Sequence, residues 1–393
     1  MAVSEDFPAI VTAVRSPIGR LGGSLKDLAE PLLVAPVMRA ALHTAGLEPD
    51  EVDQVVFAQN FRSTDQSPNA ARVFSIGAGM PQKVPSFTIS QHCGGSLTAI
   101  ALGTQAVRTG DVQVVLAGGC ESMSRASHLV PGLRWGRRRG TIEMIDPLVM
   151  RDPICGLSMG ETAQKLADHY GIGRQDQDAY AVTSQERARA AIQMGRFDGQ
   201  LVPIALPDGS TVTTDEQPRF DTTLEAISRL RPAFSEGGSI TAGNSSTMND
   251  AAAVVIVTSA AYARQRSLRP LAQVLGCTTV GVDPSMMGVG PVPATLQLLA
   301  KLGLGVGQIG VWEVNEAFAC VVLHFLRQTG ASVDRVNPNG GAIALGHPIS
   351  ATGAVLVAKA VHEMRRMDHE YAVVAMCIGG GMGIAMLLQR GEP

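Results

Sequence analysis

Residues 85–119 read PSFTISQHCGGSLTAIALGTQAVRTGDVQVVLAGG, and this stretch decides the fold. Residues 85–89 (PSFTI) predict a short strand. Residues 96–109 are nearly apolar all round, which predicts a buried helix. Residues 112–117 predict a second, fully buried strand. A strand, a helix and a strand in this order predict a largely parallel sheet that is covered by helices, the α/β class.

The same design recurs near the C-terminus. Residues 346–353 (GHPISATG) lead into an apolar helix, and the strand 371–378 (YAVVAMCI) is followed by the glycines 379–381. In the first copy, Cys93 opens a stretch of small residues before the helix, and the strand again ends in glycines. We interpret this likeness as an internal duplication, which would place the two helix starts near a common axis.

The segments on either side of these two copies also show an alternation of strands and helices. Runs typical of strands and helices alternate before residue 121 and after residue 250, whereas the region between them is polar, rich in turns and basic at 131–140 (PGLRWGRRRG). A large insertion of this kind is able to cover a site that the core forms. We therefore expect an N-terminal half at 1–121 that is completed by about 250–269, a loop domain at 122–249 and a C-terminal half at 270–393.

The composition narrows the possible classes of function. Hydrophobic residues make up 45% and charged residues 17%, as in a compact protein, and a net charge of −3 argues against a nucleic-acid partner. The apolar runs are too short to span a membrane, and the N-terminus lacks the pattern of a secretory signal. Because the six cysteines form no CxxC pair, we expect no metal site. In a large chain without a secretory signal reduced thiols are the default, so we expect a cytoplasmic protein.

Cys93 is the first candidate for chemistry. It lies in the segment ISQHCGGS (89–96), after a strand and at the start of a helix, where the helix end favours negative charge and lowers the pKa of a thiol. Gly94 and Gly95 leave room for a ligand. A buried structural cysteine fits this segment equally well, and we interpret the adjacent His92 as structural.

Three other segments carry further candidates. His347 stands in NPNGGAIALGHPISATGA, where closely spaced glycines can hold an imidazole beside a ligand so that it takes the proton of a thiol. Cys377 ends the last buried strand, and Gly379 begins a run of free backbone donors that suits an oxyanion hole. Asn315 stands at another strand end and could hold a water molecule or a carbonyl oxygen. Each of these residues alone is also compatible with a structural role.

Together these segments resemble the thiolase family over nearly the whole chain. The resemblance implies a five-layered αβαβα fold with an inserted loop domain, a homodimer or homotetramer, and the chemistry of an acetyl-CoA acetyltransferase or 3-ketoacyl-CoA thiolase of fatty acid metabolism. The motifs that carry it are GGCESMSR (118–125), MGETAQ (159–164), TAGNSSTMNDAAA (241–253), NEAFA (315–319), NPNGGAIALGHPISATGA (337–354) and CIGGGMG (377–383).

The resemblance also implies roles for single residues. Cys93 matches the nucleophile that takes the acyl group from a coenzyme A thioester, and His347 matches the base that activates it. Cys377 matches the second acid/base, which moves the α-proton of acetyl-CoA. Asn315 matches a residue that holds a water and forms one oxyanion hole with His347. The N–H groups of Cys93 and Gly379 match the other oxyanion hole.

Coenzyme A is then a substrate, and no metal or redox cofactor is required. Ser246 matches a serine that contacts the pantetheine arm, and Arg219 matches an arginine beside the adenine. Met159, Met287 and Phe318 match residues that line the acyl pocket. A surface role for the arginine and a core role for the methionines are alternatives.

The chain departs from the usual family pattern in several places. Gly-Gly-Ser follows Cys93, Thr247 follows the serine assigned to coenzyme A, and the stretch 60–67 (NFRSTDQS) is poorer in small residues than its family counterpart. Ser158 stands where short-chain acetoacetyl-CoA enzymes usually have histidine. These changes put the length of the acyl chain in doubt, and the missing histidine favours a longer or different 3-oxoacyl chain.

Two other functions remain open on the sequence. A decarboxylating ketoacyl synthase has the same fold but uses a cysteine with two histidines, so the thiol of Cys377 argues against it. A non-catalytic thiolase-like protein that binds coenzyme A thioesters is compatible with the altered loops. Retention of both cysteines and of His347 argues against this second alternative.

Overall fold

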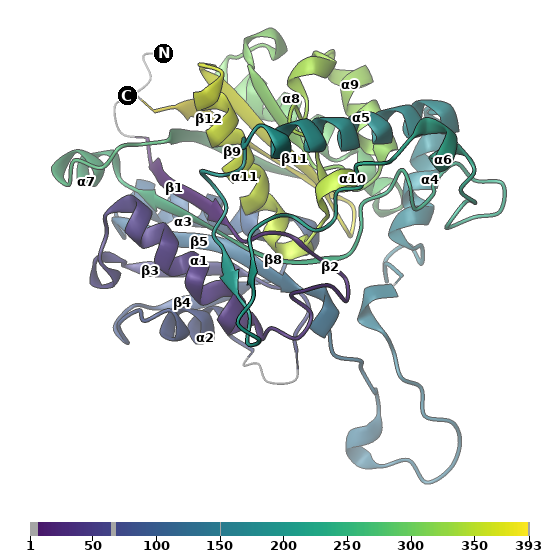
Figure 1. Ribbon diagram of the computed structural model, residues 1–393, viewed down its shortest axis with the longest axis horizontal. Helices are drawn as coiled ribbons and strands as arrows, with labels where there is room; N and C mark the ends of the chain where they lie inside the picture. The colour runs from purple at the N-terminus through teal and green to yellow at the C-terminus, as the bar shows by residue number, and fades with distance from the viewer. Residues whose placement is uncertain (1–6, 64–67, 150, 392–393) are drawn as a thin grey trace.

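The computed structural model describes residues 7–63, 68–149 and 151–391. Figure 1 shows two halves side by side and one long loop that extends from the body. Within the described ranges, no helix is long and apolar enough to cross a membrane. The stretch 60–67, which differs from the usual family pattern, lies partly outside the described residues.

The N-terminal half alternates strands and helices, as the sequence predicts. Two of its helices end where the chain turns at glycine: Gly46 caps α1 with a φ of 68° and Gly110 caps α3 with a φ of 80°, values that glycine adopts without steric cost. The elements are β1 (Ala9–Arg15), β2 (Gly19–Arg20), α1 (Glu30–Ala45), β3 (Gln54–Ala58), α2 (Ala70–Gly77), β4 (Ser86–Ile89), α3 (Gly95–Thr109), β5 (Val114–Ser122), β8 (Asn249–Thr258) and α7 (Ala260–Gln265).

The C-terminal half repeats this alternation. Its glycine-rich segment is less irregular than the sequence suggests, because 342–345 form a short helix and the following helix already begins at Ile349. The elements are β9 (Ala272–Gly281), α8 (Pro291–Leu302), β10 (Val311–Val314), α9 (Ala319–Thr329), α10 (Ala342–Leu345), α11 (Ile349–Arg366), β11 (Tyr371–Ile378) and β12 (Met382–Arg390).

The strands of both halves follow one hydrogen-bonded path. Its order is β10-β11-β12-β9-β1-β8-β5-β3-β4, with β2 paired to β8. β1 joins the halves, because Ala9 and Ile10 pair with β9 while the strand as a whole pairs with β8. The central helices α3 and α11 contact strands of both halves. With α1 and α2 on one outer face and α8 and α9 on the other, the expected five-layered αβαβα fold is confirmed.

A glycine lets the two central helices approach closely. A Cβ atom built on Gly353 of α11 would lie 2.5 Å from the backbone nitrogen of Leu97 in α3. No side chain fits at this distance, so the helices touch backbone to backbone near their N-terminal ends. The ends of α3 and α11 that follow Cys93 and His347 are thereby brought together.

An insertion between β5 and β8 supplies the outer elements. It contains α4 (Met159–His169), α5 (Arg174–Gln193), the hairpin strands β6 (Ile204–Ala205) and β7 (Thr211–Val212), and α6 (Leu224–Ser228). The loop that extends from the body in Figure 1 belongs to this insertion, and Leu129 and Ile145 close its base with backbone hydrogen bonds of 2.9 and 2.8 Å. At its tip the side chain of Trp135 is 90% exposed.

Candidate active site

The Cys93 thiol lies between the end of β4 and the start of α3. Cys93 occupies a short 3-10 turn, and the preceding His92 has a φ of 45°, an uncommon backbone conformation for a residue with a side chain. A side chain on Gly94 would overlap Ile378 of the C-terminal half. The turn that carries the thiol is therefore packed directly against the other half of the molecule.

His347 reaches the thiol from the C-terminal half. Its Nε2 atom lies 3.3 Å from Sγ of Cys93, and its Nδ1 atom lies 2.7 Å from the hydroxyl oxygen of Thr352. We assign the tautomer from these contacts: Nδ1–H donates to Thr352, and Nε2 accepts from the thiol. The backbone N–H of His347 donates to Oδ1 of Asn249 at 3.0 Å. The ring is thus fixed by contacts of both its nitrogens and of its own backbone.

Burial sets the charge of this pair. It lowers the pKa of His347 to about 4, so the imidazole is neutral at pH 7. It raises the pKa of the Cys93 thiol to about 11, although the backbone of Gly379 and of Cys93 hydrogen-bonds to the sulfur and lowers that pKa, and the charge of Glu121 raises it further. The expectation that the helix start lowers the thiol pKa is therefore wrong in this structure, because burial outweighs it.

Cys377 lies close to the same thiol. Burial raises the pKa of Cys377 well above its ordinary value, and the neighbouring sulfurs of Cys93 and Cys320 raise it further. Cys377 therefore retains its proton at pH 7. The structure gathers the three residues expected at the acyl pocket into the same apolar cluster as Cys377: Met287 and Phe318 are buried in it, and Met159 packs against it.

Asn315 and Gly379 complete the cluster of predicted residues. Nδ2 of Asn315 lies 3.4 Å from Nε2 of His347, and its buried Oδ1 has no hydrogen-bond partner among the described residues. A buried acceptor without a partner calls for a water or a substrate donor. A Cβ atom added to Gly379 would contact His92 and Met159, so Gly379 faces the turn of the thiol.

The two residues expected to contact coenzyme A lie apart from each other. Ser246 is half-buried, and its N–H donates to the carbonyl of Ala317 at 3.0 Å, within the NEAFA motif. Arg219 is exposed in the insertion, and its backbone N–H donates to Gln185 of α5 at 2.9 Å. Its guanidinium makes no hydrogen bond within the described ranges. The structure therefore brings Ser246, but not Arg219, next to a motif of the catalytic cluster.

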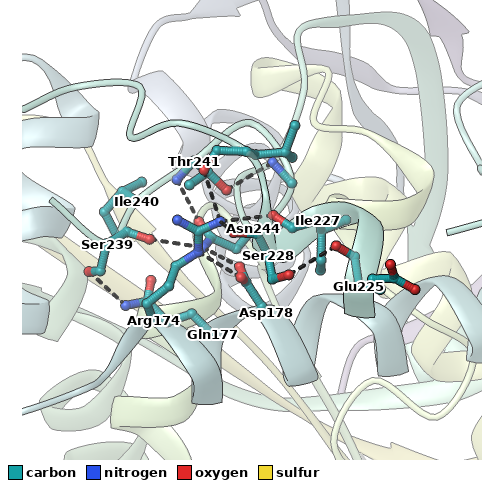
Figure 2. Close-up of polar contacts among 12 residues, drawn as sticks. Arg174, Gln177, Asp178, Glu225, Ile227, Ser228, Ser239, Ile240, Thr241 and Asn244 are labelled. Carbon is teal, nitrogen blue, oxygen red and sulfur yellow. Dashed lines mark hydrogen bonds and ion pairs between the residues drawn. The ribbon is translucent and has the colours of Figure 1, made fainter. Parts of the chain in front are cut away.

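A polar network anchors the segment that carries Ser246 (Figure 2). Asn244 donates from Nδ2 to Asp178 of α5 at 2.9 Å and to the carbonyl of Ser239 at 3.0 Å, and its Oδ1 accepts from the N–H of Thr241 at 2.8 Å. Arg174 pairs with Asp178 at 2.6 Å. Because Asp178 and Asn244 are buried, these bonds fix the segment against α5.

Three residues of the site escaped the sequence analysis: Thr352, Asn249 and Glu121. Each stands inside a motif that was quoted, but nothing in the spacing shows which motif residues face one another. Glu121 accepts from Oγ of Ser350 at 2.6 Å and from the N–H of Phe61 at 2.9 Å, so its carboxylate lies at the start of α11. Burial raises the pKa of Glu121 to about 7.

Comparison with known proteins agrees with this geometry. The family descriptions "Thiolase, N-terminal domain" and "Thiolase, C-terminal domain" match residues 8–261 and 268–390. An acetyl-CoA acetyltransferase of Pseudomonas aeruginosa is 44% identical over 97% of this chain and 98% of its own length. A beta-ketothiolase of Cupriavidus necator is 43% identical over 97% and 98%. The human mitochondrial 3-ketoacyl-CoA thiolase, solved in complex with CoA, matches with a TM-score of 0.96 at 38% identity, covering 99% of both chains.

The fold and the named relatives define an acyltransferase. With full-length relatives above 40% identity and both family domains matched, the chain belongs to the thiolase family. Its expected fold, family and enzyme class are thereby confirmed.

Proposed function

We propose that the chain cleaves 3-oxoacyl-CoA thiolytically, and catalyses the reverse Claisen condensation, through an acyl group carried on Cys93. The contact of 3.3 Å between Sγ of Cys93 and Nε2 of His347 carries this proposal. Since the imidazole is neutral at pH 7, it is free to take the thiol proton as sulfur attacks the carbonyl carbon. Thr352 keeps the lone pair of Nε2 aimed at the thiol.

Cys377 supplies the second proton transfer in this proposal. Attack on the 3-oxo carbon expels an acetyl-CoA enolate, whose carbon must receive a proton. The thiol of Cys377 is protonated at pH 7, and it lies so close to Cys93 that a charge on Cys93 raises the pKa of Cys377. In the condensing direction, the thiolate of Cys377 takes that proton back. Because each thiolate disfavours the other, the two cysteines are charged in turn.

Two donor pairs stabilise the oxyanions in this proposal. Once Nε2 of His347 has taken the thiol proton it becomes a donor, and Nδ2 of Asn315 lies beside it. The free Oδ1 of Asn315 can hold a water between the amide and a substrate oxygen. The backbone N–H groups of Cys93 and Gly379 face the sulfur and suit the oxygen of a thioester carbonyl attached to it. Preorganised donors of this kind commonly supply a large share of catalysis.

Coenzyme A is a substrate in the proposal, and no metal or redox cofactor takes part. The human thiolase that was solved in complex with CoA supports the assignment of coenzyme A as a substrate. Ser246 is proposed to contact the pantetheine arm and Arg219 the adenine end, while Met159, Met287 and Phe318 surround the acyl group. The exposed guanidinium of Arg219 would have to meet coenzyme A at the surface of the insertion.

The proposal extends to assembly and location. We infer a homodimer or homotetramer, because the loop tip exposes large apolar side chains that a free protomer would leave in water. We infer a cytoplasmic location, because all six cysteines, each within the described residues, are free thiols, as in a reducing compartment. The division into two halves and a loop domain belongs to the same proposal.

The decisive measurement is CoA-dependent cleavage of acetoacetyl-CoA and of a longer 3-oxoacyl-CoA, followed by the loss of enolate absorbance. We expect turnover with ping-pong kinetics, and the ratio of kcat/KM gives the preferred chain length. Without turnover of either thioester by folded protein that still binds CoA, the proposed function would have to be abandoned for a binding role.

A further inference from the structure

A cavity of about 500 Å³ lies where β1 parts from β9, away from Cys93 and His347. Residues 11–14 of β1 line it, and so do the C-terminal end of α1 and the loop between α7 and β9. His362 and Arg365, near the C-terminal end of α11, complete the wall. α11 has 18 residues and is about 27 Å long, with His347 just before its other end. The cavity is therefore distinct from the catalytic cluster.

The wall of this cavity is basic. Three arginines and two histidines line it, and none of the described residues in the wall is acidic. Arg269 forms no hydrogen bond or ion pair within the part of the chain that the structure describes, and Arg365 donates only to the carbonyl of Pro270, at 3.2 Å. Burial lowers the pKa of His362, and the charges of Arg365 and Arg15 lower it further. The cavity thus offers guanidinium donors that no carboxylate of the described residues occupies.

The third arginine differs from these two. Arg266 lies 2.7 Å from the carboxylate of Glu51, so its charge is already compensated. We therefore assign ligand binding to Arg269 and Arg365 rather than to Arg266.

The inner part of the cavity combines an aliphatic surface with one free hydroxyl. Val11, Val14 and Leu271 contribute the aliphatic surface. Thr12 also lines the cavity, its side chain is 1% exposed, and its hydroxyl oxygen has no hydrogen-bond partner among the described residues. Buried hydroxyl groups are nearly always hydrogen-bonded, so this orphan is a second, independent sign of a missing polar partner.

We propose that this cavity binds a small aliphatic carboxylate. The planar guanidinium groups of Arg269 and Arg365 match a carboxylate, which can accept two parallel hydrogen bonds from each fork. The aliphatic surface takes the hydrocarbon chain, and Thr12 provides one more donor. The volume lies within the range of small-molecule sites. Because the described wall contains no phenylalanine, tyrosine or tryptophan ring to stack on a nucleobase, a nucleotide fits less well.

The test is isothermal titration of the full-length protein with octanoate, octanamide and inorganic phosphate in turn. Octanoate carries both the charge and the chain, octanamide the chain alone and phosphate the charge alone. We expect octanoate to bind, and each of the other two to bind at least tenfold more weakly. Charge-assisted hydrogen bonds contribute enough for one lost arginine to weaken binding about tenfold or more.

Substitutions locate the bound octanoate. Arg269→Gln and Arg365→Gln should each weaken octanoate binding about tenfold or more. Thr12→Val, which keeps the shape and removes the hydroxyl, should weaken it less. Arg139→Gln, which removes an equal charge from the exposed loop, is the matched control and should leave the affinity unchanged. Circular dichroism on each variant confirms that it is folded.

Three results would overturn the proposal. The first is no binding of octanoate by folded protein. The second is equal affinity in wild type, Arg269→Gln and Arg365→Gln, which would place octanoate elsewhere, for example in the acyl pocket. The third is binding of phosphate or octanamide as tight as that of octanoate, which would mean another ligand class.

Discussion

Single residues differ in what they do with protons, although Cys93 and Cys377 have the same side chain. Cys93→Ala removes the attacking sulfur, so we expect no acylated protein on incubation with acetyl-CoA and a loss of cleavage of about 10⁴-fold or more. Cys377→Ala keeps the attacking sulfur and its base, so acylation should persist while carbon–carbon bond formation stops. Mass spectrometry of the intact protein and a condensation assay separate the two steps. Acylation of Cys93→Ala would refute the assignment of the nucleophile.

Thr352 acts on the chemistry only through His347, so it is a positioning residue. Thr352→Val removes the oxygen that accepts from Nδ1, and the ring is then free to turn or to shift its proton to Nε2. General-base catalysis contributes about 10²–10⁴-fold, so we expect kcat to fall about tenfold to a hundredfold. Thr352→Ser keeps the oxygen and should restore most of the rate. A purely structural role predicts instead that both variants lose stability without a selective loss of kcat.

The buried histidine at the site also links stability to pH. Its pKa is about 4 in the folded protein and near 6.5 when exposed, so between these values the unfolded chain binds a proton that the folded chain refuses. The contribution of His347 to the free energy of unfolding should therefore fall by roughly 3 kcal/mol as the pH drops from 6.5 to 4.

Urea unfolding at several pH values tests this link between His347 and stability. Between pH 6.5 and 4, His347→Gln should lose roughly 3 kcal/mol less unfolding free energy than wild type, whereas the exposed His128→Gln serves as the matched control. His324, whose pKa burial also lowers to about 4, contributes in the same direction as His347, and Glu121 and Glu313, whose pKa values burial raises to about 7, contribute in the opposite direction. An unchanged slope in His347→Gln would contradict the prediction.

Much of the residue-scale picture could be predicted from the sequence. Cys93, His347, Cys377 and Asn315 stand in recognisable motifs, and the structure brings them together. Thr352 could not be predicted, because its contact with the ring depends on where α11 begins, and the glycines before it suggested a longer loop. The pKa of the Cys93 thiol could not be predicted from the sequence either, since burial depends on packing between residues that are far apart in the chain.

Secondary-structure elements meet at glycines near the site, and one of these contacts gives a prediction. Gly353→Ala would place Cβ 2.5 Å from the backbone nitrogen of Leu97, so α11 must move away from α3. We expect a loss of about 1–3 kcal/mol of unfolding free energy, together with lower activity, because Thr352 moves with the helix. Gly77→Ala in α2 is the matched control, since its nearest neighbour would be 3.9 Å away.

The control should be neutral or slightly stabilising, because glycine weakens a helix by about 0.5–1 kcal/mol relative to alanine. Urea unfolding and the cleavage assay measure both effects. If the two substitutions cost the same, close packing of α3 and α11 is not what Gly353 provides. The sequence predicted both helices but not their contact, because periodicity shows which face is apolar and not which partner it meets.

The buried carboxylate of Glu316 connects elements that lie far apart in the sequence. Glu316 of the NEAFA motif is buried and accepts from Tyr180 and Ser184 of α5 at 2.8 and 2.6 Å. It also accepts from Asn337 at 2.9 Å, at the start of the glycine-rich segment. One side chain of the NEAFA motif thus ties the insertion to the motif 337–354 that carries His347. The motif marks Glu316 in the sequence, whereas its partners become visible only in the structure.

The whole molecule is built so that neither half holds a complete site. Cys93 lies in the N-terminal half, whereas the residues proposed as its base, as the second acid/base and as an oxyanion donor, His347, Cys377 and Asn315, lie in the C-terminal half. Alternation and duplication in the sequence predicted the two halves and the five layers. They could not predict that β1 links the sheets into one path, because two pairs of residues, Ala9 with Gln273 and Ile10 with Ala272, make that link over a long sequence separation.

The extended loop gives a prediction at this largest scale. Residues 130–144 are exposed throughout, and Leu129 and Ile145 already pair at their base. Replacing 130–144 by Asn-Gly should therefore close a tight hairpin on that pair and leave the protomer folded, with a Tm within about 2 °C of wild type. The loop also carries Leu133, Trp135 and Met144, which are exposed and apolar and suit a contact between copies of the chain.

We therefore expect the shortened protein to cleave 3-oxoacyl-CoA but to have a smaller mass by light scattering. The matched control replaces Trp135 alone by serine, which removes the most exposed side chain of the tip and keeps the length of the loop. We expect the replacement of Trp135 to weaken the assembly less than the shortened loop does, so that the mass measured by light scattering depends on protein concentration. An unchanged mass in the shortened protein would show that the loop makes no assembly contact. A fall in Tm of more than about 5 °C, on the order of 4 kcal/mol for a chain of this length, would show that the loop stabilises the protomer itself.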